Sequence, residues 1–247
     1  MTTTDVLVCH DVRKKFGSLA ALDRANMHLG EGEILGLVGP NGSGKSTLIN
    51  AVSGYFPIDA GRVLLDGHRI DGLASHRISH RGLARTYQIP RPLSSLTVLD
   101  NVKVGCYFGR RHSGRLDLDR EARRWLAFTG LESSADAAVS SLTLHQRKFL
   151  ELARALACRP RVLLLDEVLA GLNPVEVDAA IEVIRQVREA GVSIVLVEHI
   201  MRVVVKLCDR VTVLAAGCMI AEGPPQTCLR DQAVIDAYLG RQHARGS

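Results

Sequence analysis

The glycine-rich segment at residues 39–47 carries the clearest chemical signature in this sequence. It reads Gly-Pro-Asn-Gly-Ser-Gly-Lys-Ser-Thr, which fits the phosphate-binding pattern G-x-x-x-x-G-K-[ST]. An apolar run precedes it at residues 34–38 and an apolar-periodic run follows at residues 48–52, as expected of a strand before the loop and a helix after it. Backbone N–H groups and the positive end of that helix would converge on nucleotide phosphates. The alternative is a glycine-rich structural turn with a surface lysine.

Several residue types in this loop suit one task each in nucleotide binding. Lys45 is a mobile point charge that can reach the β- and γ-phosphates, the Ser46 hydroxyl can ligate Mg²⁺, and Thr47 can bond the α-phosphate. The residues expected to hold the nucleotide are Gly39, Pro40, Asn41, Gly42, Ser43, Gly44, Lys45, Ser46 and Thr47.

An acidic pair supplies the second half of the expected chemistry. Asp166 and Glu167 follow an apolar run at residues 162–165, so they stand at the carboxyl end of an expected buried strand, where open α/β sheets bind ligands. Asp166 would hold the Mg²⁺ shell and Glu167 would polarise the attacking water. Alone, such a pair is more typical of a helix N-cap, but a phosphate loop in the same chain favours the catalytic interpretation.

Two other classes of phosphate-loop protein fit less well than an ATPase. Guanine-nucleotide switch proteins carry a base-reading N-K-x-D motif, and no Asn-Lys dipeptide occurs in this chain. Small-molecule kinases usually lack an adjacent Asp-Glu pair. The sequence therefore predicts an enzyme that binds and hydrolyses ATP.

The apolar pattern along the chain predicts an α/β fold that positions these residues. Asp66-Gly67 suits a tight hairpin turn, and too many residues separate Lys45 from Asp166 for one crossover helix, so a helical insertion is expected between them. Apolar strands alternating with helices indicate a parallel sheet covered on both faces. The expected strands are residues 6–9, 25–29, 33–38, 62–65, 68–70, 83–88, 162–165 and 193–197, and the expected helices include 118–128, 149–157 and 174–189.

Composition excludes several classes of protein. With 247 residues, 47% of them apolar and 23% charged, the chain is globular rather than disordered. Its six cysteines form no C-x-x-C pair, so we expect a reducing compartment and neither a disulfide framework nor a zinc site. No uncharged run is long enough for a membrane span, and no secretory leader is expected. The net charge of +5 is compatible with nucleic acid, an anionic membrane surface, a phosphate-rich ligand or a basic solvated surface.

Taken in order, these motifs resemble those of the ATP-binding cassette family, the ATPase subunits of ABC transporters, over nearly the whole chain. The resemblance implies a single domain, 1–247, with a RecA-like parallel-sheet core and an antiparallel β subdomain in residues 1–87 and 158–247. Residues 88–157 would form an inserted helical subdomain.

Further site residues follow from the same resemblance. Phe16 would stack on adenine, although an ordinary core phenylalanine is the alternative. Gln88 would contact Mg²⁺ and the reacting water, and His199 would touch the γ-phosphate. The catalytic group is thus Glu167, His199, Gln88 and Lys45, and the metal ligands are Ser46, Gln88 and Asp166.

The signature segment departs from the family pattern. LSGGQ is replaced by Leu142, Thr143, Leu144, His145 and Gln146, a segment that in the family faces ATP held by the partner subunit. Thr143 can still supply a hydroxyl and cap the following helix. His145 replaces a glycine, loses conformational freedom and could crowd the phosphate. Our hypothesis is that this chain's own phosphate loop is competent, while the composite site it completes for a partner is weakened.

Longer segments resemble the larger ATPase of the branched-chain amino-acid importer family. They are residues 83–88, 96–105, 170–176, 198–225 and 234–240, and the loop at 170–173 ends in Asn173, as is common in that group, where other cassettes have Asp. The resemblance implies a peripheral subunit on the cytoplasmic face of the inner membrane. Its partners would be two membrane permeases, a second ATPase in a heterodimer or homodimer and, indirectly, a periplasmic or lipid-anchored binding protein.

Other functions remain open at this point. The same family imports urea, amides and aromatic acids. A soluble ABC ATPase acting in translation, DNA repair or iron-sulfur assembly is a second class, although no nucleic-acid partner is expected, and a weakly hydrolysing nucleotide-binding subunit is a third. Trp125 and the basic cluster of Arg110, Arg111, His112 and Arg115 are expected on a solvated or permease-facing side, and residues 242–247 are expected to fray.

Overall fold

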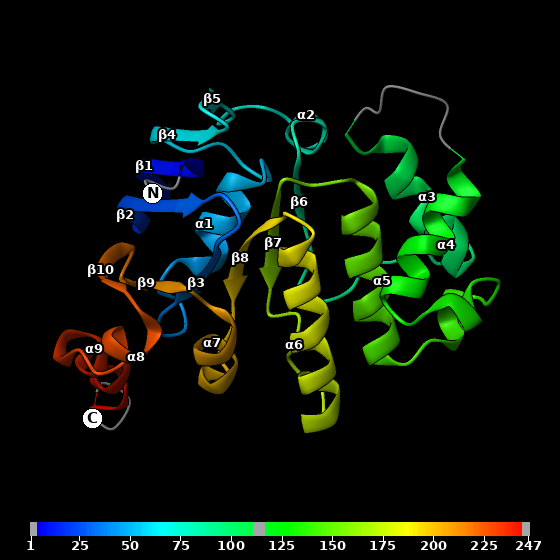
Figure 1. The fold of residues 1–247 in the computed structure, drawn as a ribbon. Helices are drawn as coiled ribbons and strands as arrows, with labels where there is room; N and C mark the ends of the chain where they lie inside the picture. The colour runs from blue at the N-terminus through cyan, green and yellow to red at the C-terminus, as the bar shows by residue number, and fades with distance from the viewer. Residues whose placement is uncertain (1–3, 111–116, 244–247) are drawn as a thin grey trace. The chain divides into compact units, whose positions relative to one another are not determined.

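The computed structural model describes residues 4–110 and 117–243 (Figure 1). These residues form two compact units, one made of residues up to 74 together with those from 193 onward, and the other made of residues 75–192. Among the described residues, no helix is both long and apolar enough to cross a membrane.

An antiparallel sheet occupies much of the first unit. Its strands are β1 (Asp5–Phe16), β2 (Leu19–Gly30), β4 (Ala60–Leu65) and β5 (His68–Arg69), in the order β2-β1-β4-β5. The hairpin predicted at Asp66 and Gly67 is confirmed, because both residues have positive φ, 50° and 73°. β1 and β2 are longer than predicted, because irregularities in their register interrupt the apolar alternation that marks a strand in sequence.

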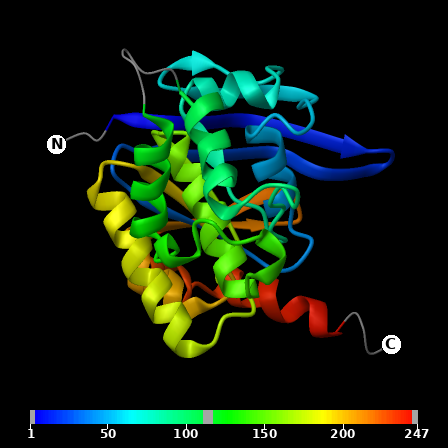
Figure 2. The same cartoon turned by 90° about the vertical axis from the view of Figure 1, so that its right-hand side faces the viewer.

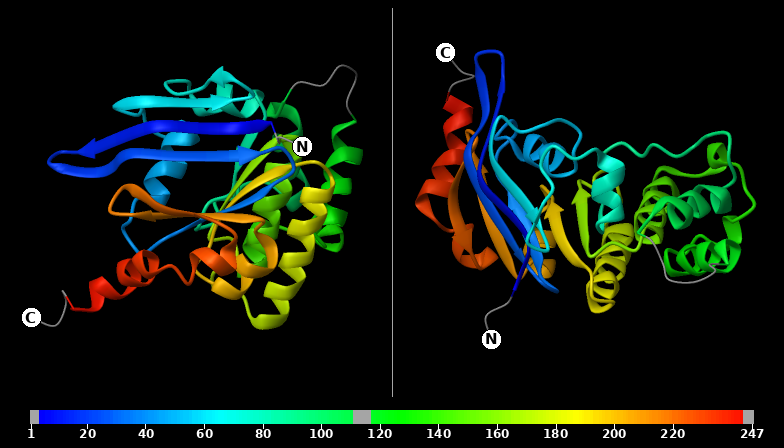
Figure 3. Two further views of the ribbon diagram at one scale, coloured as in Figure 1. Left: turned by 60° about the vertical axis from the view of Figure 1, so that its left-hand side comes forward. Right: turned by 90° about the horizontal axis from the view of Figure 1, so that it is seen from above.

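The parallel strands of the first unit carry the phosphate loop. They are β3 (Ile34–Val38) and β8 (Ser193–Val197), with β9 (Arg210–Ala215) and the hairpin strand β10 (Cys218–Gly223), in the order β10-β9-β3-β8. β3 runs parallel to β8 and β9, and all residues of β3 and β8 are buried. The helices are α1 (Lys45–Val52), α7 (Met201–Leu207), α8 (Pro225–Cys228) and α9 (Gln232–His243). Figure 3 shows β1 and β2 as a long twisted ribbon in this unit.

The second unit is mainly helical (Figure 2). The parallel pair β6 (Leu83–Arg85) and β7 (Val162–Asp166) accompanies α2 (Ser75–His80), α3 (Val98–Phe108), α4 (Leu118–Phe128), α5 (Leu144–Ala157) and α6 (Pro174–Glu189). Short 3₁₀ turns at Glu132–Ser134 and Val139–Ser141 precede α5. α3 packs against both α4 and α5, and their apolar faces form the core of this unit.

The predicted α/β fold class, with a parallel sheet and an N-terminal antiparallel sheet, is confirmed. The helix at 174–189 and the strand at 193–197 have the predicted bounds. The strand predicted at 83–88 is wrong in length and ends at Arg85. The compact units also divide the chain elsewhere than the expected helical insertion at 88–157, because β6, β7 and α6 group with the helices. The functional boundaries of that insertion stay a prediction.

Candidate nucleotide-binding site

Two glycines give the phosphate loop a backbone path that no other residue could follow. Gly39 and Gly44 have φ of 146° and 112°. A Cβ on Gly39 would lie 2.0 Å from the Leu214 carbonyl oxygen, and one on Gly44 would lie 2.6 Å from that of Ala21. The loop is therefore pressed against β9 and the β2 strand, which fixes its shape before any ligand binds.

Lys45 lies folded over this loop. Its side chain is buried, and its ammonium donates hydrogen bonds to the carbonyls of Gly39 (2.7 Å) and Pro40 (3.1 Å). The Ser43 hydroxyl is also buried and has no hydrogen-bond partner among the described residues. A concave loop with a buried cation and an unused hydroxyl is suited to an anion such as a phosphate chain.

The other expected residues of the first unit differ in exposure. Asn41, Gly42 and Ser46 are exposed, and Thr47 is half-buried. His199 follows β8 and is exposed, while its neighbour Glu198 is buried. The roles of these residues in binding or hydrolysis stay predictions.

Phe16 ends β1 with 48% of its surface exposed, so the alternative of an ordinary core phenylalanine is wrong. Its ring stands edge-on to Phe56 at 5.4 Å between centroids, and the Lys14 ammonium lies 5.6 Å from it. An exposed ring beside a cation is a suitable platform for a base. Adenine stacking on Phe16 stays a prediction.

Tyr238 is a neighbour of the loop that sequence reasoning missed. It projects from α9, and its phenolic oxygen accepts a hydrogen bond from the Gly39 backbone. Burial raises the pKa of Tyr238, against the lowering effect of that hydrogen bond. The C-terminal helix therefore supports the phosphate loop, over a sequence distance that no local pattern could reveal.

The second unit supplies the acidic pair. Asp166 ends β7 and is buried, and its carboxylate accepts a hydrogen bond from the Arg85 guanidinium at 2.7 Å. The Thr86 hydroxyl accepts a hydrogen bond from the Asp166 backbone N–H at 3.3 Å. Arg85 was not expected, because a lone arginine at a strand end gives no sequence signal. It keeps a buried carboxylate paired.

Glu167 has a left-handed backbone, with φ of 50°, which is uncommon for a residue other than glycine. Its carboxylate accepts a hydrogen bond from the Gln88 side-chain amide. The structure therefore brings together two residues that the sequence placed far apart. Lys148, a third residue that the sequence did not predict, donates hydrogen bonds to the backbone carbonyls of Glu167 (3.2 Å) and Ala170 (2.5 Å). These contacts hold the segment after β7 in its strained path.

The signature segment begins α5 with a closed capping box. The Thr143 hydroxyl accepts from the Gln146 N–H at 3.2 Å, and the Gln146 side chain accepts from the Thr143 N–H at 2.9 Å. The predicted capping role of Thr143 is confirmed. Leu142 is buried, whereas Thr143 and Leu144 are exposed.

His145 turns back along its own helix. Its ring stands against Phe149, with 4.4 Å between centroids, and its Nδ1 lies 3.9 Å from a Glu176 carboxylate oxygen. Glu176 belongs to the capping box that Asn173 forms at the start of α6. The signature segment is thus tied to the loop at residues 170–173. Whether His145 crowds a phosphate stays a prediction.

The remaining surface predictions fall on the second unit. Trp125 is half-buried, and its indole N–H donates to Glu121 at 3.2 Å. Arg110 is exposed, while Arg111, His112 and Arg115 lie outside the described residues. Of the tail expected to fray, residues 244–247 also lie outside them.

Comparison with known proteins identifies the family. A family model described as ABC transporter matches residues 22–170, and one described as branched-chain amino acid ATP-binding cassette transporter matches residues 218–244. A probable branched-chain amino acid transport ATP-binding protein, LivG, of Archaeoglobus fulgidus is 38% identical over 96% of both chains. The high-affinity branched-chain amino acid transport ATP-binding protein BraF of Pseudomonas aeruginosa is 33% identical over 95% of this chain and 98% of its own.

Solved structures agree with this assignment. A nucleotide-free ATP-binding cassette from an ABC transporter superposes with a TM-score of 0.85 at 28% identity, over 95% of this chain and 98% of the other. The ADP conformation of another such cassette gives 0.86 at 29% identity, over 96% of this chain and all of the other. The chain therefore belongs to the ATP-binding cassette family of ABC transporters, and it is an ATP-hydrolysing subunit of that family.

Proposed function

We propose that this chain powers an importer of branched-chain or other hydrophobic amino acids. The observation that carries the proposal is the match of residues 218–244 to the branched-chain amino acid cassette model. Relatives that are 33–38% identical over nearly their full length are named as branched-chain amino acid transport subunits. Urea, amides and aromatic acids remain the alternative solutes, because the ATPase subunit does not touch the solute.

We assign a chemical role to each site residue from its position in the sequence motifs. The phosphate loop and Lys45 bind the triphosphate, and Glu167 polarises the attacking water. Gln88 orients the Glu167 carboxylate through their hydrogen bond. His199 contacts the γ-phosphate and Phe16 the adenine, as the family resemblance implies.

Mg²⁺ fits the donors that this chain offers. The Ser46 hydroxyl, the Gln88 amide oxygen and the Asp166 carboxylate are oxygen ligands, the type that Mg²⁺ prefers. When bound, the ion neutralises charge on the β- and γ-phosphates. The hydrogen bond from Arg85 orients the Asp166 carboxylate for this role.

The exposed start of α5 supports assembly with a second cassette. The exposed Thr143 and Leu144 at the start of α5 are available to ATP held by a second cassette. We infer a pair of ATPases that closes head-to-tail on two ATP molecules beneath two permeases, on the cytoplasmic face of the membrane. A separate binding protein would deliver the solute.

The test is to tag the chain in its own host and to identify what co-purifies from solubilised membranes. Two polytopic permeases and a second cassette are the expected partners, and the recovered complex can then be assayed with leucine, urea, amides and aromatic acids. Recovery of the chain only from the soluble fraction, together with ribosomes, DNA or assembly factors, would contradict a role in a transporter. ATP turnover by the complex that is unaffected by Glu167→Gln would instead favour a weakly hydrolysing binding subunit.

A further inference from the structure

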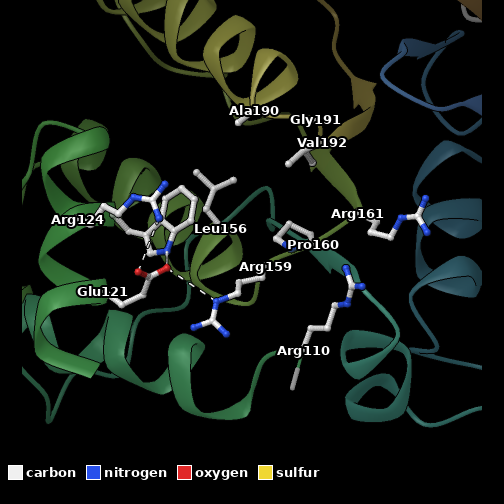
Figure 4. A pocket seen from close by; sticks show the side chains of 11 residues that line it. Arg110, Glu121, Arg124, Leu156, Arg159, Pro160, Arg161, Ala190, Gly191 and Val192 are labelled. Carbon is white, nitrogen blue, oxygen red and sulfur yellow. Dashed lines mark hydrogen bonds and ion pairs between the residues drawn. The ribbon is translucent and has the colours of Figure 1, made fainter. Parts of the chain in front are cut away.

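A pocket of about 500 Å³ in the second unit is lined by residues that the nucleotide chemistry does not use (Figure 4). Its walls come from α4, from Arg110 after α3, from the end of α5 and its connection to β7, and from residues 190–192 after α6. A volume of this size is typical of a site for a small organic ligand. The lining shares no residue with the phosphate loop, the acidic pair or the signature segment.

The pocket lining has a large excess of positive charge. Glu121 is the one carboxylate among the lining residues that the structure describes, and the same lining contains four arginines, Arg110, Arg124, Arg159 and Arg161. Its oxygens lie 3.8 Å from Arg159 Nε and 3.8 Å from Arg124 Nη1, which are loose ion pairs. In Figure 4, Glu121, Arg124 and Arg159 gather on one side of Pro160, with Arg110 and Arg161 on the other.

Arg159 has a donor that its surroundings do not satisfy. Its side chain is 22% exposed, and its Nη2 is buried without a hydrogen-bond partner among the described residues. The residue also has a left-handed backbone, with φ of 54°, immediately before Pro160. A buried donor of a charged group that lacks a partner is costly, so an acceptor supplied by a ligand would stabilise this arrangement.

The rest of the lining is apolar. Leu156, Pro160 and Val192 contribute aliphatic surface, and Trp125 contributes an indole. The Arg124 guanidinium lies 5.2 Å from the Trp125 ring centroid, and the indole N–H is already bonded to Glu121. The pocket therefore combines an excess of guanidinium groups, one of which has an unpaired buried donor, with an apolar wall, and this suits a ligand that has both an anionic group and an apolar body.

We propose that this pocket binds a small organic phosphate at a second site, separate from the nucleotide site. The phosphate pairs with Arg159 and the neighbouring guanidinium groups, and the organic body packs against Leu156, Pro160 and Trp125. A phosphate matches this lining better than a carboxylate, because it has more negative charge and three oxygens to accept hydrogen bonds from more than one guanidinium group.

The test uses the fluorescence of Trp125, which is the only tryptophan in the chain. Phenyl phosphate is titrated into the full-length protein without Mg²⁺ at constant ionic strength. We expect a saturable fluorescence change, with affinity at least about tenfold higher than for inorganic phosphate or benzoate, each of which lacks one half of the match. No saturable change, or equal affinity for all three probes, would overturn the proposal.

Substitutions in and outside the pocket test whether phenyl phosphate binds there. Arg159→Gln and Arg124→Gln should each weaken phenyl phosphate binding by about tenfold. Arg124 is 70% exposed, so its replacement tests the pocket even if Arg159→Gln fails to fold. Arg123→Gln, on the same helix but outside the pocket, should bind as the wild type does. Lys45→Ala should also bind normally, and a loss of binding in that variant would assign the signal to the phosphate loop instead.

Discussion

Helices α1 and α5 begin within the phosphate loop and the signature segment, respectively, where phosphate binding is expected. Their N-termini differ in how the backbone N–H groups are capped. α1 begins after Gly44, and no side-chain hydrogen bond caps it among the described residues. α5 begins after Thr143, whose hydroxyl is already paired within a closed capping box. Without a side-chain cap, the first backbone N–H groups of a helix can donate hydrogen bonds to a ligand. In a capping box, side chains of the helix accept some of these hydrogen bonds instead. That the composite site is weaker than the chain's own site stays a prediction, and it rests on His145.

The largest expected effect comes from Glu167→Gln, which separates ATP hydrolysis from ATP binding. We predict that Glu167→Gln lowers the rate of ATP hydrolysis by about 10²- to 10⁴-fold, because the water loses its polarising carboxylate. ATP binding should persist, since the phosphate loop is untouched. Rapid-quench single-turnover assays measure the first effect and equilibrium binding the second. Glu182→Gln, an exposed position on α6, serves as the control and should hydrolyse ATP normally.

Altering the backbone of the loop tests its rigidity. Gly39→Ala would place a methyl group 2.0 Å from the Leu214 carbonyl oxygen, so we expect ATP binding to be lost and the free energy of unfolding to fall by about 3 kcal/mol or more. Gly67 also has a positive φ, 73° against 146° for Gly39, but open space around it, so Gly67→Ala should cost only about 1 kcal/mol. Urea denaturation distinguishes them. Equal losses would mean that close approach to Leu214 does not shape the loop.

Features that depend on neighbouring residues could be predicted from the sequence, whereas contacts between distant residues could not. The loop was predictable because its path depends on glycines within nine residues, and α6 because Pro174 and Gly191 mark its ends. Arg85 and Lys148 were missed because each bonds a partner that is 81 or 19 residues away, respectively, and neither position has a distinguishing local pattern. Long-range partners become visible only when β6, β7 and α5 come together.

The interior of α5 adds a dependence of stability on pH. Burial raises the pKa of Glu151 to about 7, against the lowering effects of a hydrogen bond from the Tyr87 backbone and of Arg154. Between its ordinary pKa of 4.5 and about 7, the native state binds the proton more tightly than the unfolded state, so stability falls as pH rises through this window. The loss attributable to Glu151 is on the order of 3 kcal/mol.

Glu151→Gln should remove this contribution while keeping an acceptor for the Tyr87 N–H. Urea denaturation at about pH 5 and about pH 8 should therefore show a smaller decrease in stability for the variant than for the wild type. The same decrease in both proteins would show that Glu151 ionises normally.

The smallest predicted effects concern the signature segment itself. Thr143→Ala removes the helix cap and should lower the free energy of unfolding by about 1 kcal/mol. A more informative change is His145→Gly, which restores the glycine of the family motif and removes the contacts with Phe149 and Glu176.

In the Glu167→Gln background, His145→Gly should increase ATP-dependent dimer formation by this chain, as measured by light scattering. A robust homodimer that retains His145 would contradict the hypothesis that the signature is weakened.

Uptake by the reconstituted complex tests whether this chain couples ATP hydrolysis to amino-acid import, as we propose. The native complex is placed in liposomes with its binding protein and radiolabelled leucine, and ATP is supplied on the side of the cassettes. We expect ATP-dependent accumulation of leucine that is lost in the Lys45→Ala complex. Accumulation that is independent of ATP, or that survives Lys45→Ala, would contradict it.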